Sequence, residues 1–112
     1  MTTTTPLSPS VSAYLDLASS DDKTPAAELF SLDAVVRDND DVRSGRDAIR
    51  SWLAGSASEY TYTSTLLSSE ETDGVALLSM LLEGDFPGGR VELHYRFELA
   101  ADGLIESLTI SV

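Results

Sequence analysis

The spacing of apolar residues changes from a helical to a strand period along the chain. Near the N-terminus, apolar residues recur at intervals of three and four. These positions are Val11, Tyr14, Leu15 and Ala18. The interval predicts an amphipathic helix, with Ser8 offering an N-cap oxygen and Pro9 as the first helical residue. Thr24 and Pro25 repeat this start signal and predict a second, shorter helix.

A short strand and a third helix are predicted in the middle of the chain. Residues 32–38 contain two adjacent β-branched valines and run into the polar cluster 38–41, which is typical of a strand that ends in a turn. Ser44 and Asp47 have the spacing of a capping box, with Asp in place of Glu. The helix predicted behind them ends at Gly55. Its apolar stripe consists of Ile49, Trp52 and Leu53.

From Glu59 onward the apolar period is two, as in β-strands. Four strands are predicted, at residues 60–69, 75–83, 90–99 and 104–111. They are separated by the turn sequences Asp73-Gly74, Phe86-Pro87-Gly88-Gly89 and Asp102-Gly103. Short turns of this kind predict an antiparallel meander.

Helices followed by antiparallel strands predict an α+β fold. We expect a curved antiparallel sheet, a cone-shaped α+β barrel, with three N-terminal helices covering one face. Residues 8–112 are expected to form a single domain and residues 1–7, which are rich in threonine, a disordered tail. The mouth of such a sheet is where a ligand pocket is expected.

Two of the predicted strands differ in how they should be covered. Residues 90–99 alternate strictly, with one apolar and one polar face, whereas residues 75–82 are apolar on both faces. Helices can cover only one face of the second strand. A second copy of the chain is the simplest cover for the other, so we expect a homodimer formed through the sheet.

Composition and charge exclude several classes of partner. Nineteen acidic against seven basic residues give the 112-residue chain a net charge of -12, which repels nucleic acid and anionic membranes. The chain has no cysteine for a disulfide or a thiolate metal site. The first ten residues carry no secretion signal, and the longest apolar run, 75–82, is too short to cross a bilayer, so a soluble cytoplasmic protein is expected.

No metal or phosphate site is predicted from local motifs. Residues 38–41 resemble the opening of a calcium-binding loop, but Val42, Arg43 and Ile49 stand where a ligand, a glycine and a glutamate are needed. His94, the single histidine, lies on the polar face of its strand and is expected to face solvent or a dimer partner.

The order of these elements resembles that of the nuclear transport factor 2-like superfamily and, within it, the SnoaL-like proteins. The similarity rests on Tyr14 in its helix and on the segments 29–36, 44–52, 86–89 and 93–97, and it extends over nearly all of the chain from Val11 on. It implies the cone-shaped fold with a pocket for a small molecule. Members of the superfamily include isomerases, cyclases, dehydratases, epoxide hydrolases and proteins without catalytic activity, so the fold alone does not define the reaction.

The ketosteroid isomerase branch of this superfamily can be compared residue by residue. The resemblance implies that Tyr14 corresponds to the oxyanion-hole tyrosine and Asp38 to the general base. The third group, a protonated carboxylic acid, falls on Leu93, which cannot donate a hydrogen bond. Because losing one such donor typically lowers the rate by about 10²–10³-fold, the difference argues against efficient steroid isomerisation.

Asp38 and Tyr14 are therefore the candidate catalytic residues. Desolvation at the edge of an apolar pocket makes a carboxylate a stronger base, and a buried phenol needs a hydrogen-bond partner. Each residue also has a structural alternative: Asp38 could accept backbone N–H groups of the turn 39–41, and Tyr14 could simply pack in the core. The candidate substrate contacts are Trp52, Leu93, Tyr95 and Phe30. For Trp52 and Tyr95, core packing is again the alternative.

Two functions are consistent with the sequence. The first is a cofactor-independent isomerase, cyclase or dehydratase in which Asp38 moves a proton on an apolar, carbonyl-bearing substrate. The second is a non-catalytic module of the same fold that binds a ligand or only dimerises, which the leucine at position 93 favours. The substrate itself is not encoded in any motif of the chain.

Overall fold

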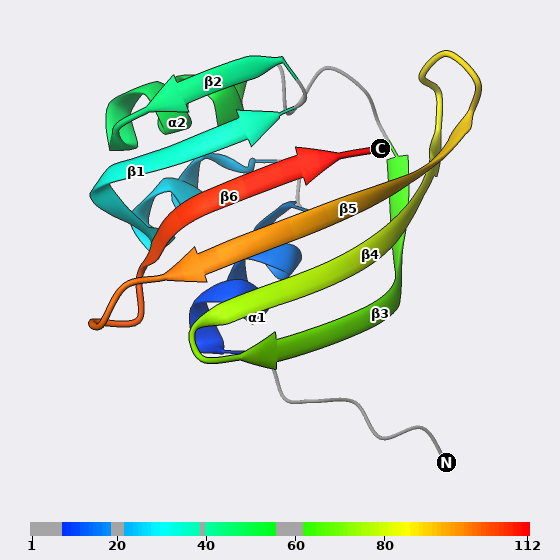
Figure 1. Cartoon of the computed structure of the whole chain (residues 1–112). Helices are drawn as coiled ribbons and strands as arrows, with labels where there is room; N and C mark the ends of the chain where they lie inside the picture. The colour runs from blue at the N-terminus through cyan, green and yellow to red at the C-terminus, as the bar shows by residue number, and fades with distance from the viewer. Residues whose placement is uncertain (1–7, 19–21, 39, 56–61) are drawn as a thin grey trace.

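The computed structural model describes residues 8–18, 22–38, 40–55 and 62–112. It shows one mixed sheet with helices behind one of its faces (Figure 1). The predicted disordered tail, residues 1–7, and the predicted start of a strand at residue 60 lie outside the described residues.

The first two helices begin where the sequence predicts. Helix α1 spans Pro9–Ala18, and its first backbone hydrogen bond runs from the Ser12 N–H to the Ser8 carbonyl at 3.0 Å. The Ser8 hydroxyl donates to the Glu71 carboxylate. The second helix, η1, is a 3-10 helix at Thr24–Leu29 with the proline in its first turn.

The third helix, α2, spans Arg46–Ala54 and does not use the predicted capping box. Gly45 is its N-cap, with φ at +91° and no side-chain cap bond, so the capping role of Ser44 and Asp47 was wrong. Glycine adopts this positive φ without steric cost, and the chain can therefore turn directly from a strand into the helix. Gly55 ends α2, as predicted, with its N–H bonded to the Ser51 and Trp52 carbonyls.

Six strands are present. They are β1 (Phe30–Asp38), β2 (Asp41–Ser44), β3 (Tyr62–Thr72), β4 (Val75–Gly84), β5 (Arg90–Leu99) and β6 (Ile105–Ser111). The last three agree with the predicted ranges to within one residue. Strand β3 runs on to Thr72, three residues beyond its predicted end. Strand β2 was not predicted, because four residues are too few to show a period and its pairing with β1 is a tertiary feature.

The strands form one sheet in the order β2-β1-β6-β5-β4-β3. Strands β3 to β6 make the predicted antiparallel meander. Strand β1 runs parallel to β6, so the sheet is mixed and not purely antiparallel as predicted. In the described residues β2 and β3 are its edges, which leaves the sheet curved but open and not a closed barrel.

The core lies between the helices and one face of the sheet. On β4, the buried residues are Ala76, Leu78, Met80 and Leu82. On the opposite face of this strand Leu77 remains 45% exposed, so only one of its two apolar faces is covered within the chain. On β5 the alternation predicted a core face correctly, and Phe97 on it is fully buried.

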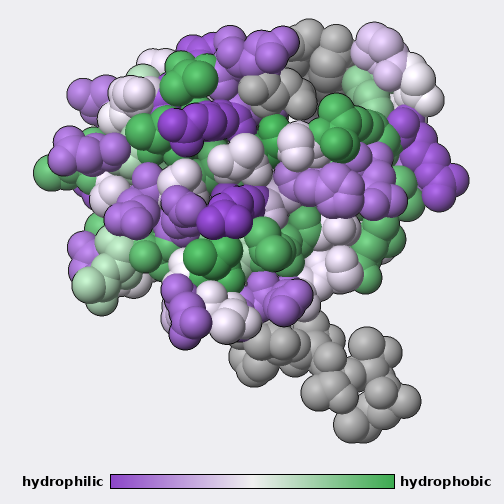
Figure 2. Space-filling view, viewed as in Figure 1, coloured by the Kyte–Doolittle hydropathy of each residue, from purple (hydrophilic) through white to green (hydrophobic). Residues whose placement is uncertain are grey.

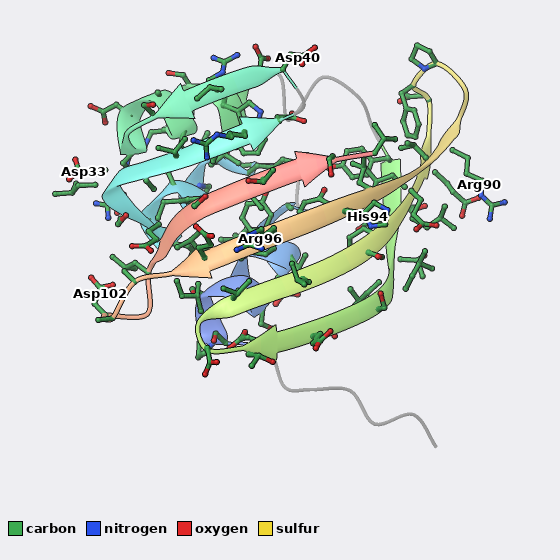
Figure 3. The ribbon with its side chains drawn as sticks, viewed as in Figure 1. Asp33, Asp40, Arg90, His94, Arg96 and Asp102 are labelled. Carbon is green, nitrogen blue, oxygen red and sulfur yellow. The ribbon has the colours of Figure 1, made fainter. Side chains whose placement is uncertain are left out.

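The face of the sheet turned away from the helices, the open face, is mixed in character. Figure 2 looks onto it and shows hydrophobic residues interspersed with hydrophilic ones. His94 and Arg96 project from β5 on this side (Figure 3). The His94 Nδ1 lies 3.1 Å from the Ser79 hydroxyl oxygen, and the Arg96 guanidinium pairs with Glu98 at 2.9 Å. No helix among the described residues is long and apolar enough to cross a membrane.

Candidate functional site

A cavity of about 140 Å³ lies on the side of the sheet that the helices cover. Side chains from α1, from α2, from the residue before η1 and from five strands meet there. The lining residues are Tyr14, Ala18, Lys23, Asp38, Trp52, Leu53, Tyr62, Leu82, Leu93, Tyr95 and Ile110. They include one carboxylate, one ammonium group and three phenols, so the cavity combines an apolar wall with several polar groups, as ligand sites do.

Asp38 is the carboxylate of this lining, and the end of β1 carries it. Its backbone pairs with Asp41 of β2 on one side and with Ile110 of β6 on the other, which fixes the direction in which the strand ends. The indole N–H of Trp52, from α2, donates to Asp38 Oδ2 at 3.3 Å. The structural alternative for Asp38, binding the turn 39–41, involves Asn39, which lies outside the described residues.

Tyr14 reaches the cavity from α1 and is only 3% exposed. Its ring packs edge-on against Phe30 and Phe97, with ring centroids at 5.9 and 5.4 Å. Burial raises the pKa of Tyr14 well above its ordinary value, and nearby Tyr95, Tyr62 and Asp38 raise it further. The phenol therefore remains protonated at neutral pH and can donate a hydrogen bond.

Tyr62 and Tyr95 are the other two phenols of the lining. Burial raises the pKa of both, and the negative charge of Asp38 contributes to each shift. Tyr95 also stacks on Phe97 at a centroid distance of 6.2 Å. Because all three phenols stay neutral, Asp38 is the lining residue suited to accept a proton from a bound molecule.

Lys23 was not among the candidates from the sequence. It directly precedes η1. In the sequence, the residues around it indicate only the end of the first helix. The residue is 9% exposed, and its Nζ lies 5.4 Å from the centroid of the Tyr62 ring. The one feature of the sequence that distinguishes this residue is that it is the single lysine of the chain.

Five of the six candidate residues line this cavity. They are Tyr14, Asp38, Trp52, Leu93 and Tyr95. Phe30 lies outside the lining; it is fully buried and packs behind the Tyr14 ring. Its main-chain carbonyl accepts two hydrogen bonds from the Arg46 side chain, at 3.0 and 2.6 Å, which ties the start of β1 to α2.

The remaining polar candidates belong to other surfaces. His94 is half-exposed on the open face, with its Nε2 3.7 Å from a Glu92 carboxylate oxygen. A shallow groove of about 450 Å³ lies beside His94, and its lining includes Leu77 and Thr109. Within the described ranges, no three histidine or acidic side chains are close enough to hold a metal ion.

No protein-family model matches this chain, and neither does any curated protein. Among solved structures it is similar to a proposed polyketide cyclase from Sinorhizobium meliloti, with 33% identity over 94% of this chain and 95% of that one, and a TM-score of 0.85. It is also similar to a protein with a ketosteroid isomerase-like fold from Catenulispora acidiphila, with 16% identity, coverage of 95% and 87%, and a TM-score of 0.81.

A third similar structure is SalBIII, an epoxide hydrolase/cyclase-like enzyme of pyran ring formation in the polyether salinomycin. The identity is 22%, the coverage is 90% of this chain and 85% of that one, and the TM-score is 0.70. At this identity the likeness concerns the fold. All three similarities extend over at least nine-tenths of the chain.

Proposed function

Because this chain belongs to the SnoaL-like proteins of the nuclear transport factor 2-like superfamily, we propose that it is a cofactor-independent enzyme of the isomerase, cyclase or dehydratase kind. Its substrate would be an apolar compound that carries a carbonyl group. The observation that supports this proposal best is the presence of Tyr14 and Asp38 on the lining of one cavity. A base and a hydrogen-bond donor around the same small volume are what enolisation requires.

In the proposed reaction, Asp38 removes a proton from the carbon next to the carbonyl. The C–H electron pair forms the enolate double bond, the carbonyl π electrons move to oxygen, and the proton is held on the carboxyl group. Tyr14 donates a hydrogen bond to the enolate oxygen, since its raised pKa keeps it protonated. The enolate then takes the proton back at another carbon, expels a leaving group, or attacks a second carbonyl to close a ring.

Trp52 would orient the base during this reaction. Its indole N–H binds one carboxylate oxygen of Asp38, and indole has no acceptor with which to compete for the proton. Leu93 supplies an apolar wall at the position where ketosteroid isomerases carry their second oxyanion donor. Fewer donors mean weaker stabilisation of the enolate, which favours substrates with more acidic C–H bonds.

The size of the cavity limits what it can enclose. Its volume of about 140 Å³ is close to the roughly 150 Å³ of an apolar cavity that accepts benzene. It is well below the roughly 300–1,000 Å³ that is usual for the pockets of drug-sized ligands. We therefore favour a substrate, or a reactive end of a substrate, no larger than a single ring.

Deuterium exchange tests the proposal without knowledge of the natural substrate. In D₂O, loss of the proton NMR signals beside the carbonyl would be followed for 4-oxopentanoate and for 5-methyl-2-hexanone, which have the same number of heavy atoms. Asp38→Asn should lower the protein-catalysed exchange rate by about 10²–10⁴-fold, the usual contribution of a general base. Asp41→Asn is the matched control, because Asp41 lies opposite in the same hairpin but outside the lining.

Exchange that survives Asp38→Asn would contradict the assignment of the base. The second candidate function is a non-catalytic binding module, which the apolar Leu93 and the small cavity support. For such a module, either probe would bind and change the fluorescence of Trp52, the single tryptophan of the chain, but no exchange above the buffer rate would occur with the unaltered protein.

We also propose that the chain forms a homodimer through its open face. The support is the exposure there of Leu77, which belongs to a strand that is apolar on both sides. Val75 and Leu81, on the same face of this strand, are only partly buried. Apolar side chains of this size on one sheet are often covered by a partner.

A further inference from the structure

The position of Lys23 is unusual for a lysine. The side chain belongs to a residue that is only 9% exposed, and it lines the cavity together with Asp38 and Tyr14. Lysine is almost never buried to this degree unless it is paired, because removing an ammonium group from water is costly. Its contact therefore has to compensate for the lost hydration.

The contact that the structure shows is with an aromatic ring and not with a carboxylate. Nζ lies 5.4 Å from the centroid of the Tyr62 ring, within the range of a cation–π interaction. Among the described residues no ion pair involves Lys23. In contrast, four arginines pair with carboxylates at 2.9–3.7 Å: Arg43, Arg46, Arg50 and Arg96.

A cation–π contact stabilises the positive charge, but the aromatic ring does not use up the N–H donors of the ammonium group. The ammonium group has three N–H donors, and an oxygen anion can accept from them at the same time as the ring contacts the charge. The three phenols of the lining are neutral, and Asp38 is its single carboxylate. Lys23 is thus the group of the cavity suited to bind an anionic part of a ligand.

We propose that Lys23 is the anion-binding residue of this cavity and that the small substrate, apolar around its carbonyl group, also bears a carboxylate. The identification of the compound as a substrate rests on the proposed function above, whereas anion binding by Lys23 does not. In this arrangement the carboxylate contacts Lys23, and like-charge repulsion keeps it away from Asp38. The carbonyl end is then left to the base and to Tyr14.

Because the chain is strongly negative, binding of an anionic ligand requires a positively charged group close to it. At -12, the protein as a whole does not attract anions, so recognition has to come from a short-range contact inside the cavity. The volume of about 140 Å³ limits the ligand to a short keto acid or a single ring with a carboxylate.

Trp52 fluorescence provides the binding assay, since this single tryptophan lines the same cavity. The probes are 4-oxopentanoate and 5-methyl-2-hexanone, in which an uncharged isopropyl group with the same number of heavy atoms replaces the carboxylate. The unaltered protein should bind the keto acid about tenfold more tightly than the ketone, as a charge-assisted hydrogen bond predicts. Lys23→Met should abolish this preference and leave the affinity for the ketone unchanged within about twofold.

Two further variants complete the test. Lys23→Arg keeps the charge and should retain a preference for the keto acid. Arg90→Met removes an exposed cation outside the lining and should change neither affinity. Unchanged ketone binding also demonstrates that Lys23→Met is folded.

A preference that persists in Lys23→Met would overturn the proposal, and so would an equal loss of both ligands, which indicates a structural role. Failure of the anion-binding proposal can be distinguished from failure of the catalytic proposal. If exchange depends on Asp38 but the preference does not depend on Lys23, only the anion-binding proposal fails. If binding of the keto acid depends on Lys23 but no exchange occurs, anion binding stands and the catalytic proposal fails.

Discussion

Replacing Trp52 by phenylalanine should test whether the contact between α2 and the end of β1 holds the candidate base in place. The substitution removes the indole N–H that donates to Asp38 Oδ2 at 3.3 Å. It keeps an aromatic ring at a position that is only 2% exposed. The change therefore combines the loss of one hydrogen bond with a small loss of core volume.

Both losses can be given a magnitude. A hydrogen bond to a carboxylate contributes about 1.5–3 kcal/mol, and at 3.3 Å this bond is longer than the usual range, so about 1.5 kcal/mol is expected. Phenylalanine is smaller than tryptophan by about 40 Å³, which at about 24 cal/mol per Å³ of cavity costs about 1 kcal/mol. The free energy of unfolding should fall by about 2.5 kcal/mol, and the melting temperature of a domain this size by roughly 10 °C.

Urea unfolding followed by circular dichroism measures this change, because the fluorescent residue is absent from the variant. A double-mutant cycle with Asp38→Asn isolates the hydrogen bond, since an amide oxygen is a weaker acceptor than a carboxylate. In a chain that already carries Asp38→Asn, the substitution Trp52→Phe should cost about 1 kcal/mol less than in the unaltered chain. An equal cost in both backgrounds would refute the inference that the indole stabilises the carboxylate.

Two further predictions concern pH and assembly. Burial raises the pKa of Tyr14 above its ordinary 10.0. The stability that the buried neutral phenol contributes is therefore complete below pH 10 and is lost as the pH rises toward the pKa in the folded state. Urea unfolding between about pH 8 and 11 should show that the free energy of unfolding decreases by up to about 1.4 kcal/mol per pH unit from this residue alone. Leu77→Glu places a charge on the open face and should convert the proposed dimer to a monomer in light scattering, whereas Ala101→Glu, in an exposed turn, should not. A flat stability profile above pH 10, or a monomer before any substitution, would contradict the respective prediction.

The sequence alone predicted the elements that are specified by local physics. The alternation over residues 90–99 and the glycine of Asp73-Gly74, with φ at +78°, identified a strand and a turn that the structure confirms. Helix α1 was predicted in the same way from its spacing. The resemblance that these elements supported also led to the correct fold family.

The tertiary structure decided what depends on distant pairing. Strand β2 is too short to have a period, and the parallel pairing of β1 with β6 joins segments about 70 residues apart, which local patterns do not encode. The same holds for the cavity: a lysine next to a helix start reads as an exposed charge, and only the approach of β3 places Lys23 against Tyr62. Helical and strand periods and turn chemistry act between neighbours in the chain, whereas the lining of a site depends on how separate elements pack.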